Sequence, residues 1–288
     1  MNSFEISRTG TYLTVQDFGR HHYQHLGISP SGAMDHRIPT SLEFVIPNHK
    51  NQFLEFAYVG PSLKITEGAI KVCVGGNCKI FVQKKNNTQI EYQPFTSINL
   101  FEGDELTIHE TIDSVYGYIA IENGLGLEPC LGSYATDTKA NIGSISRPLQ
   151  IGDIFHINED VNSWELISKE ITTVIKQTNF KVYPGPQLSF FDDETIQHFI
   201  SSSYKITTQS DRMGLRLEGE PLKSIQSQDI LSEGILPGCI QVPNNGQPIV
   251  LLRDIPCTGG YPKIAILDSE DVSKIAQLPP GSKVTFDL

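Results

Sequence analysis

The residues best suited to chemistry lie in four runs of small, polar and charged residues. These runs cover residues 14–20 with 23–35, then 185–187, then 209–219, and finally 243–247 with 253–262. They bring together carboxylates, a histidine, guanidinium groups and closely spaced glycines. Such groups bind anions, transfer protons and position substrates. We therefore expect the working surface of the protein to be built from these loops.

The third and fourth runs indicate an anion-binding site. Arg212 follows Ser210 and Asp211 directly, and its planar guanidinium is a natural partner for a substrate carboxylate. In the fourth run, Gly259 and Gly260 allow backbone N–H groups to approach an anion closely. A ligand that carries a carboxylate or phosphate is the expected occupant.

Two sets of site residues follow from these runs. We predict catalytic roles for Asp17, His25, Asp211 and Arg212. We predict substrate-binding roles for Ser31, Gly32, Asp35, Gln187, Ser210, Gln247, Thr258, Gly259, Gly260 and Tyr261. No residue is assigned to a metal site, because the histidines are scattered and Cys73 and Cys78 flank a turn without further ligands.

Simpler interpretations stay open beside these roles. Asp17 is equally suited to capping a turn, and Ser31 and Asp35 to capping a helix. His25 is more typical of a structural histidine than of a base. Two other guanidiniums of these runs, Arg20 and Arg216, are interpreted as surface cations paired with carboxylates.

Composition and motifs exclude several classes of protein. The net charge is −11 with no basic stripe, which disfavours nucleic-acid binding. No Walker-type phosphate loop, dinucleotide-binding glycine motif or nucleophile elbow is present. The five cysteines show no paired spacing, and no secretion signal or long apolar stretch is seen. We expect a cytoplasmic protein with reduced thiols and no membrane contact.

The elements that must position these loops are mostly strands. β-Branched runs at 70–74, 80–82, 240–242 and 248–252 are bounded by turn residues. Asn245-Gly246 lies between the last two and predicts a hairpin with a type I′ turn. Residues 100–108, 149–157 and 278–286 form a weak repeat in which a glycine precedes an alternating strand.

Helices are few and short in this interpretation. We predict them at residues 34–45, 192–200 and 269–276. Residues 160–181 are interpreted as a junction between two β-rich lobes, at 1–165 and 180–288, which have room to share strands. The expected fold class is therefore mostly β, with a few short helices.

The runs together resemble a known family. Their order and residues are similar to the C subunit of bacterial ATP-dependent 5-oxoprolinases, the KipA-like or "allophanate hydrolase subunit 2" family, which also includes part of the carboxyltransferase region of urea carboxylase. The matching stretches extend from about residue 8 to the C-terminus and include 14–20, 23–27, 31–35, 184–187, 209–217, 231–234, 246–249 and 258–265. His21-His22, Asn77 and Cys257 depart from the usual pattern, which leaves loop details and substrate choice open.

The resemblance implies a cyclophilin-like β-barrel architecture. It also implies an enzyme that opens 5-oxo-L-proline to L-glutamate with ATP hydrolysis, together with a KipI-like partner and a LamB/YcsF-like partner. Because this chain has no phosphate loop of its own, ATP with Mg²⁺ is expected at an interface between the proteins of the complex or on a partner.

In this interpretation the substrate lactam becomes electrophilic when ATP phosphorylates its amide oxygen. Arg212 would hold the carboxylate or a phosphate, and N–H groups near Gly32 and Gly259 would donate further hydrogen bonds. Asp17, His25 or Asp211 would position water or a metal-bound phosphate.

Two other functions remain open. One is a carboxyltransferase module of a biotin-dependent urea or amide carboxylase, which would require carboxybiotin from another protein. This chain lacks the Met-Lys-Met sequence of a biotin carrier. The other is a non-enzymatic antagonist of a KipI-like inhibitor.

Overall fold

Several strands of the chain show an alternation of buried and exposed side chains, whereas central strands such as β10 (Tyr116–Ile121) are buried throughout. In β6 (Cys78–Gln83), for example, Cys78, Ile80 and Val82 are buried while the residues between them are not. The computed structural model describes residues 2–225 and 230–288. These residues divide into two units, of which the first contains Met1–Arg20 and Ser31–Val174 and the second contains His21–Pro30 and Ile175–Leu288.

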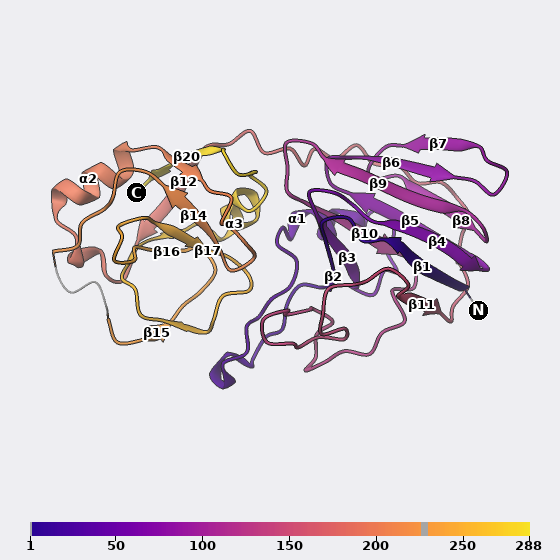
Figure 1. The fold of residues 1–288 in the computed structure, drawn as a ribbon, viewed down its shortest axis with the longest axis horizontal. Coiled ribbons are helices and arrows are strands. Elements are labelled where there is room, and N and C mark those ends of the chain that lie inside the picture. Colours follow the sequence, from indigo (N-terminus) through magenta and orange to yellow (C-terminus); the bar gives the residue numbers. More distant parts are fainter. Residues whose placement is uncertain (1, 226–229) are drawn as a thin grey trace. The chain divides into compact units, whose positions relative to one another are not determined.

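The first unit contains two antiparallel sheets (Figure 1). One has the order β11 (Ile154–Ile157), β1 (Asn2–Arg8), β4 (Ser62–Glu67), β9 (Glu105–Thr111), β6 and β7 (Gln89–Tyr92). The other has the order β2 (Tyr12–Gln16), β3 (Phe53–Ala57), β10 (Tyr116–Ile121), β5 (Ala69–Gly75) and β8 (Ser97–Phe101). Ile6 and Leu63 of the first sheet share one buried cluster with Leu54 and Val72 of the second. The two sheets therefore pack face to face around a common core.

The second unit is a closed seven-stranded barrel. Its order is β12 (Asn179–Pro184), β19 (Lys263–Leu267), β16 (Cys239–Gln241), β17 (Ile249–Leu251), β14 (Gly214–Glu218), β13 (Tyr204–Ile206) and β20 (Lys283–Asp287). The parallel pairing of β20 with β12 closes the ring. A small ladder of β15 (Glu233–Gly234) and β18 (Thr258–Gly259) lies outside it.

Helices occupy little of either unit. They are α1 (Arg37–Leu42), α2 (Asp193–Ser201) and α3 (Ser269–Ile275), with short 3₁₀ turns η1 (Gln24–Leu26) and η2 (Leu188–Phe190). α2 covers one part of the barrel, where Phe199 stacks on Phe286 of β20 with ring centroids 5.2 Å apart. No helix in the described part of the chain is long and apolar enough to cross a membrane.

The mostly-β class, the barrel and the few short helices are confirmed. The repeat glycines Gly103, Gly152 and Gly281 have φ of 89°, 91° and 95°. This is the left-handed region that glycine enters without a steric penalty, and β9, β11 and β20 begin within two residues of them. The helices predicted at 192–200 and 269–276 appear as α2 and α3.

Two local predictions were wrong in detail. The first predicted helix is only Arg37–Leu42. Pro39 has no N–H group and is tolerated only in the first turn of a helix, so a helix that contains it cannot begin as early as residue 34. The hairpin of β16 and β17 exists, with Ile240 opposite Val250. Its connection is longer than a type I′ turn, and Gly246 has positive φ while Asn245 does not.

The segment His21–Pro30 leaves the first unit and groups with the second. The predicted lobes at 1–165 and 180–288 did not include such an excursion. Ser29 anchors it, since its hydroxyl donates to the carbonyl oxygen of Arg253 at 3.1 Å. The second unit is thus built from two separate stretches of the chain.

Candidate functional site

Asp17 is a buried acceptor that organises a neighbouring loop. Its carboxylate accepts hydrogen bonds from the Ser133 hydroxyl at 2.9 and 2.8 Å, and from the backbone N–H of Tyr134 and of Gly19 at 2.7 Å each. A carboxylate with this many donors is held in one orientation. The structure therefore gives Asp17 a loop-bracing role, and a catalytic role for it stays a prediction.

Arg20 is not the surface cation that the sequence suggested. It is 1% exposed, and it donates to the carbonyl oxygen of Ala135 at 2.8 Å and to that of Cys130 at 3.3 Å. Arg20 and Asp17 thus hold the same loop, at residues 130–135, from the same end of β2. The interpretation as a surface ion pair was wrong, because Arg20 is buried and backbone carbonyl oxygens, rather than carboxylates, accept its hydrogen bonds.

Ser31, Gly32 and Asp35 lie in a tightly packed turn of the first unit. A Cβ atom on Gly32, whose φ is 89°, would come within 2.7 Å of the Gly19 nitrogen. Asp35 is fully buried and pairs with Arg37 at 2.6 Å. Ser31 is 2% exposed. These residues are brought together, and Gly32 permits the close approach of two backbone segments.

Two buried side chains hold the backbone of this turn. Glu55 Oε2 accepts the N–H of Met34 at 2.8 Å, and the Tyr118 hydroxyl accepts the N–H of Asp35 at 2.8 Å. Burial raises the pKa of Tyr118 well above its ordinary 10.0, and the charges of Glu55 and Asp35 raise it further. Tyr118 is therefore a neutral hydroxyl over the whole physiological range.

His25 lies on the exposed η1 turn of the excursion, in the second unit. Neither of its ring nitrogens has a hydrogen bond or ion pair to another described residue. The structure does not group it with Asp17 within one unit. Its assignment as a base stays a prediction.

Arg212 is enclosed in an ion pair rather than directed at open space. Its Nε and Nη2 donate to the two oxygens of Asp254 at 2.6 and 2.9 Å. The two side chains are 8% and 3% exposed. Asp254 thus occupies the face of the guanidinium that we predicted would bind a substrate carboxylate, and the substrate role of Arg212 stays a prediction.

The neighbours of Arg212 shape the same loop. Asp211 Oδ1 accepts the N–H groups of Met213 at 2.8 Å and Gly214 at 3.3 Å, and the Ser210 hydroxyl accepts that of Arg216 at 3.0 Å. These local bonds are typical of turns. In the structure, Ser210 and Asp211 form the turn that leads into β14, and their roles toward a substrate stay predictions.

Gln187 belongs to a second polar network on the barrel. It donates to Glu233 at 2.7 Å and accepts the N–H of Lys263 at 3.2 Å, while the Lys263 ammonium also contacts Glu233. The hydrogen bond from Lys263, followed by that from Gln187, lowers the pKa of Glu233. Glu233 lies opposite Gly259 in the β15–β18 ladder, so this network fixes the loop against which Thr258 and Gly259 pair.

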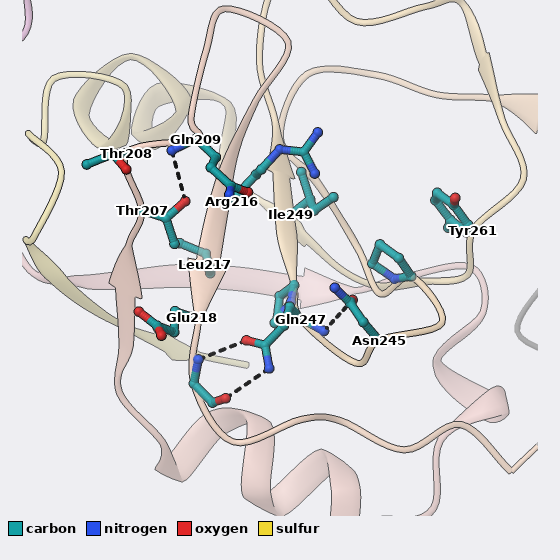
Figure 2. Close-up of a pocket in the computed structure, with 13 residues that line it drawn as sticks. Thr207, Thr208, Gln209, Arg216, Leu217, Glu218, Asn245, Gln247, Ile249 and Tyr261 are labelled. Atoms are coloured by element: carbon teal, nitrogen blue, oxygen red, sulfur yellow. Dashed lines mark hydrogen bonds between the residues drawn. The ribbon is translucent and has the colours of Figure 1, made fainter.

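Gln247 imitates a backbone amide. Its side chain accepts the N–H of Gly219 at 2.9 Å and donates to the Gly219 carbonyl at 3.0 Å (Figure 2). With both polar atoms engaged, Gln247 serves to fix one wall of a cavity.

Two adjoining cavities lie on the barrel. The larger, of about 750 Å³, is lined mainly by polar residues of β14, of the turn after β13 and of the β16–β17 connection: Thr207, Thr208, Gln209, Arg216, Leu217, Glu218, Gly219, Pro243, Asn245, Gln247, Pro248, Ile249 and Tyr261. The smaller, of about 200 Å³, has mostly apolar walls with glycines at one side: Asp211, Met213, Gly214, Arg216, Ile235, Gln241, Ile249, Leu251, Ile255, Pro256, Gly259, Gly260 and Tyr261. Arg216, Ile249 and Tyr261 line both.

Arg216 is the functional candidate that sequence reasoning missed. It forms no ion pair within the described part of the chain, in contrast to the surface pairing that we expected. Figure 2 shows its guanidinium extending toward the side of Tyr261, and both residues line both cavities. The sequence contains a signal for this position. Arg216 lies between two leucines, Leu215 and Leu217, which are buried, so the alternation of a strand places Arg216 on the outward face of β14.

The structure therefore brings together part of the predicted set. Asp211, Gln247, Gly259, Gly260 and Tyr261 line one or both cavities of the barrel. Asp17, Ser31, Gly32 and Asp35 lie in the other unit. Among the residues that the structure describes, no group of three or more metal-binding side chains is found.

Known proteins extend this description. Residues 26–288 match the family described as "Carboxyltransferase domain, subdomain A and B". The C subunit of the 5-oxoprolinase of Escherichia coli (strain K12) is 32% identical over 98% of this chain and 90% of that protein.

Two solved structures share the fold over essentially the whole chain. The structure of TTHA0988 superposes with a TM-score of 0.85 at 27% identity, and this chain spans 100% of its own length and 56% of that chain. The urea amidolyase of K. lactis gives a TM-score of 0.86 at 25% identity, where this chain covers 18% of the larger protein. Family and fold agree, and the chain belongs to the carboxyltransferase subdomain A and B family, alongside the 5-oxoprolinase C subunits.

Proposed function

We propose that this chain is the C subunit of an ATP-dependent 5-oxoprolinase, which opens 5-oxo-L-proline to L-glutamate. The observation that carries the proposal is the Arg216 guanidinium, free of ion pairs among the described residues, at the junction of two cavities. It stands in a chain that is similar to a 5-oxoprolinase C subunit over 98% of its length. The substrate is a small ring with one carboxylate, and the site offers one cation beside a small apolar cavity.

The smaller cavity suits the lactam ring. Ile235, Leu251 and Ile255 supply apolar contact, and the two glycines, Gly259 and Gly260, leave room for close approach of a ligand. Arg216 at the rim would hold the carboxylate, and so orient the ring carbon. The chain's own contribution is binding and orientation of the substrate.

The cavities do not suit the triphosphate of ATP. The larger one contains one guanidinium and also the carboxylate of Glu218, so its charge does not match a polyanion with Mg²⁺. We therefore place ATP on a partner protein or at an interface within the complex. When bound there, ATP supplies the phosphoryl group that activates the amide oxygen of the lactam.

The test is reconstitution. The purified chain is mixed with a KipI-like partner and a LamB/YcsF-like partner, and glutamate release from 5-oxo-L-proline is measured with and without ATP. We expect release only from the complete mixture. Unchanged release when this chain is omitted would contradict the proposal.

Arg216→Ala tests the role of the guanidinium within this complex. Loss of one charge-assisted hydrogen-bonding partner costs about 1.5–3 kcal/mol, so kcat/KM should fall roughly tenfold or more. Glu91→Gln, on the exposed strand β7 of the other unit, is the matched control and should leave kcat/KM unchanged. Equal activity of Arg216→Ala and the control would remove Arg216 from the site.

A carboxyltransferase role is the second candidate. It is favoured by the match to the carboxyltransferase family and by the likeness to urea amidolyase. It would require carboxybiotin carried by another protein. Carboxyl transfer from free carboxybiotin to urea or an amide, in the absence of oxoprolinase activity, would support it over the first.

A further inference from the structure

Ring opening changes the charge of the ligand. 5-Oxo-L-proline carries one carboxylate and a neutral lactam, whereas L-glutamate carries two carboxylates and an ammonium group. Hydrolysis therefore creates one positive and one negative charge where there was an amide. A site that accepts both molecules equally well would need to solvate that ammonium group after the reaction.

The smaller cavity is poorly suited to this. Its walls are largely aliphatic, including Ile235, Leu251 and Ile255, and the carboxylate of Asp211 at its edge already accepts the N–H groups of Met213 and Gly214 through Oδ1. Transfer of an ammonium group into mainly aliphatic surroundings is unfavourable. The product formed there would be driven toward a more polar environment.

The larger cavity supplies the missing group. It contains both Arg216 and Glu218, two residues apart on the same outward face of β14, whose intervening residue Leu217 is buried. Side chains at this spacing on a strand start roughly 7 Å apart, and both of these side chains line the same cavity.

Neither charge is neutralised by an ion pair within residues 2–225 and 230–288. Among the described residues, Arg216 and Glu218 form no ion pair with each other or with a third side chain. Lys205 lies opposite Glu218 in the β13–β14 register, yet the two are not joined by an ion pair either. In Figure 2, Arg216 extends toward Tyr261 while Glu218 points the other way, toward the side of Thr207 and Thr208.

We propose that the larger cavity binds the ring-opened product, L-glutamate, with Arg216 on a carboxylate and Glu218 on the ammonium group. This inference rests on the proposed function and deepens it. Arg216 lines both cavities, so one guanidinium keeps its carboxylate while the rest of the molecule moves from the apolar cavity to the polar one. Glu218 then discriminates product from substrate, because only the product has an ammonium group.

The test is calorimetric titration of the full chain with L-glutamate, 5-oxo-L-proline and glutarate, which is glutamate without its ammonium group. Glu218→Gln should weaken glutamate binding about tenfold or more. The affinities of this variant for 5-oxo-L-proline and glutarate should not decrease, because neither ligand has an ammonium group to pair with Glu218. Arg216→Ala should weaken the binding of all three ligands, and Glu91→Gln should change none.

Several outcomes would overturn the inference. They are no binding of glutamate to the wild-type chain, an unchanged glutamate affinity in Glu218→Gln, and equal losses for glutamate and glutarate in that variant. Unfolding curves exclude misfolding, and a Glu218→Asp variant, which keeps the charge, should recover part of the preference for glutamate over glutarate.

Failure of the proposed function would look different. If the reconstituted complex has no oxoprolinase activity, but glutamate binding still depends on Glu218, the cavity is an amino-acid site of another process. If the complex is active, but Glu218→Gln binds glutamate normally, only the product site is refuted.

Discussion

At the scale of single residues, the pairing of Arg212 with Asp254 is a matter of stability first. Truncating one partner leaves the other buried and uncompensated, which costs about 3–5 kcal/mol. We expect Arg212→Ala to lower the free energy of unfolding by about that amount in urea titrations. Arg216→Ala, which removes an exposed guanidinium from the same run, should change it by roughly 0.5 kcal/mol or less.

A result in the other direction would restore the substrate role predicted for Arg212. If Arg212→Ala is as stable as Arg216→Ala yet loses kcat/KM in the reconstituted complex, the guanidinium acts on the ligand. Arg212→Lys refines the comparison, because lysine keeps the charge and loses the bidentate geometry.

Tyr118 gives a prediction that depends on pH. Its folded pKa is raised above 10.0, so its neutral form stabilises the fold fully below about pH 10, and this contribution declines as pH rises toward the folded pKa. Tyr118→Phe also strands the N–H of Asp35, at a cost of about 1–3 kcal/mol. The stability gap between wild type and Tyr118→Phe should therefore be constant below about pH 10 and narrow above it.

Denaturant titrations at a series of pH values measure this gap. If the stability difference between wild type and Tyr118→Phe already narrows near neutral pH, an ionisable group other than Tyr118 controls the stability of the turn at residues 31–35. Tyr58→Phe is a useful reference, since burial raises the pKa of Tyr58 as well, while no neighbouring carboxylate contributes to that shift.

Residue types were more predictable than residue partners. Asp17 was recognised as suited to a turn, and it does brace one, but its partner Ser133 lies 116 positions away. Asp254 lies 42 positions from Arg212. Such pairs are set by the topology of the sheet and barrel, which a single sequence does not specify. The periodicity of β14, in contrast, is local, and it identifies Arg216 as outward-facing.

At the scale of elements, the β15–β18 ladder depends on one glutamate. Glu233 accepts hydrogen bonds from the side chains of Lys263 and Gln187. The neighbouring Ile235 forms part of the wall of the smaller cavity. Glu233→Gln removes the charge, so amide hydrogen exchange at Gly234 and Ile235 should become faster. The amides of β12 should exchange as in the wild type.

The sign of the pH effect follows from the same contacts. Because the pKa of Glu233 is lowered from 4.5, its ion pair is present above that value and is lost as pH falls through the folded pKa. Wild-type protection should thus be constant from neutral to mildly acidic pH. Protection in Glu233→Gln equal to wild type would mean that the backbone ladder alone holds the loop.

Elements that depend on contacts between residues close in the sequence were predicted better than elements that depend on distant residues. α2 was predicted well because its N-cap is local, with Asp192 accepting the N–H of Thr195 at 2.8 Å. The start of α1 was predicted too early, although Pro39, which is tolerated only in the first turn of a helix, is a local signal for it. Barrel closure by β12 and β20 joins residues about one hundred positions apart and left no local signal.

At the scale of the whole molecule, cleavage within the excursion His21–Pro30 tests whether the fold persists when the chain is no longer continuous. Leu26 is 64% exposed on it, so limited chymotrypsin treatment should cut there, as it should at the more exposed Phe44 and Leu231, and the fragment that ends at Leu26 is the one to follow. β1 pairs with β4 and β11, and β2 pairs with β3 along its full length. We expect the N-terminal fragment to stay bound after cleavage.

Size-exclusion chromatography followed by denaturing electrophoresis measures this outcome. Two bands from a single native peak support the prediction, and loss of the small fragment would contradict it. Since the excursion groups with the second unit and its flanks with the first, the nicked protein is also a reagent for asking which unit supports assembly with the partner proteins.

The parallel pairing of β20 with β12 has a consequence for biosynthesis. β12 emerges from the ribosome first among the barrel strands, but the ring cannot close until residues 283–287 have been made. Until then, β12 and β13 each lack a neighbour and expose unpaired backbone groups. The first unit, whose strands end at Ile157, is complete well before that point. A nascent chain stalled just before β20 should therefore bind chaperones through its second half, whereas its first half is already resistant to protease.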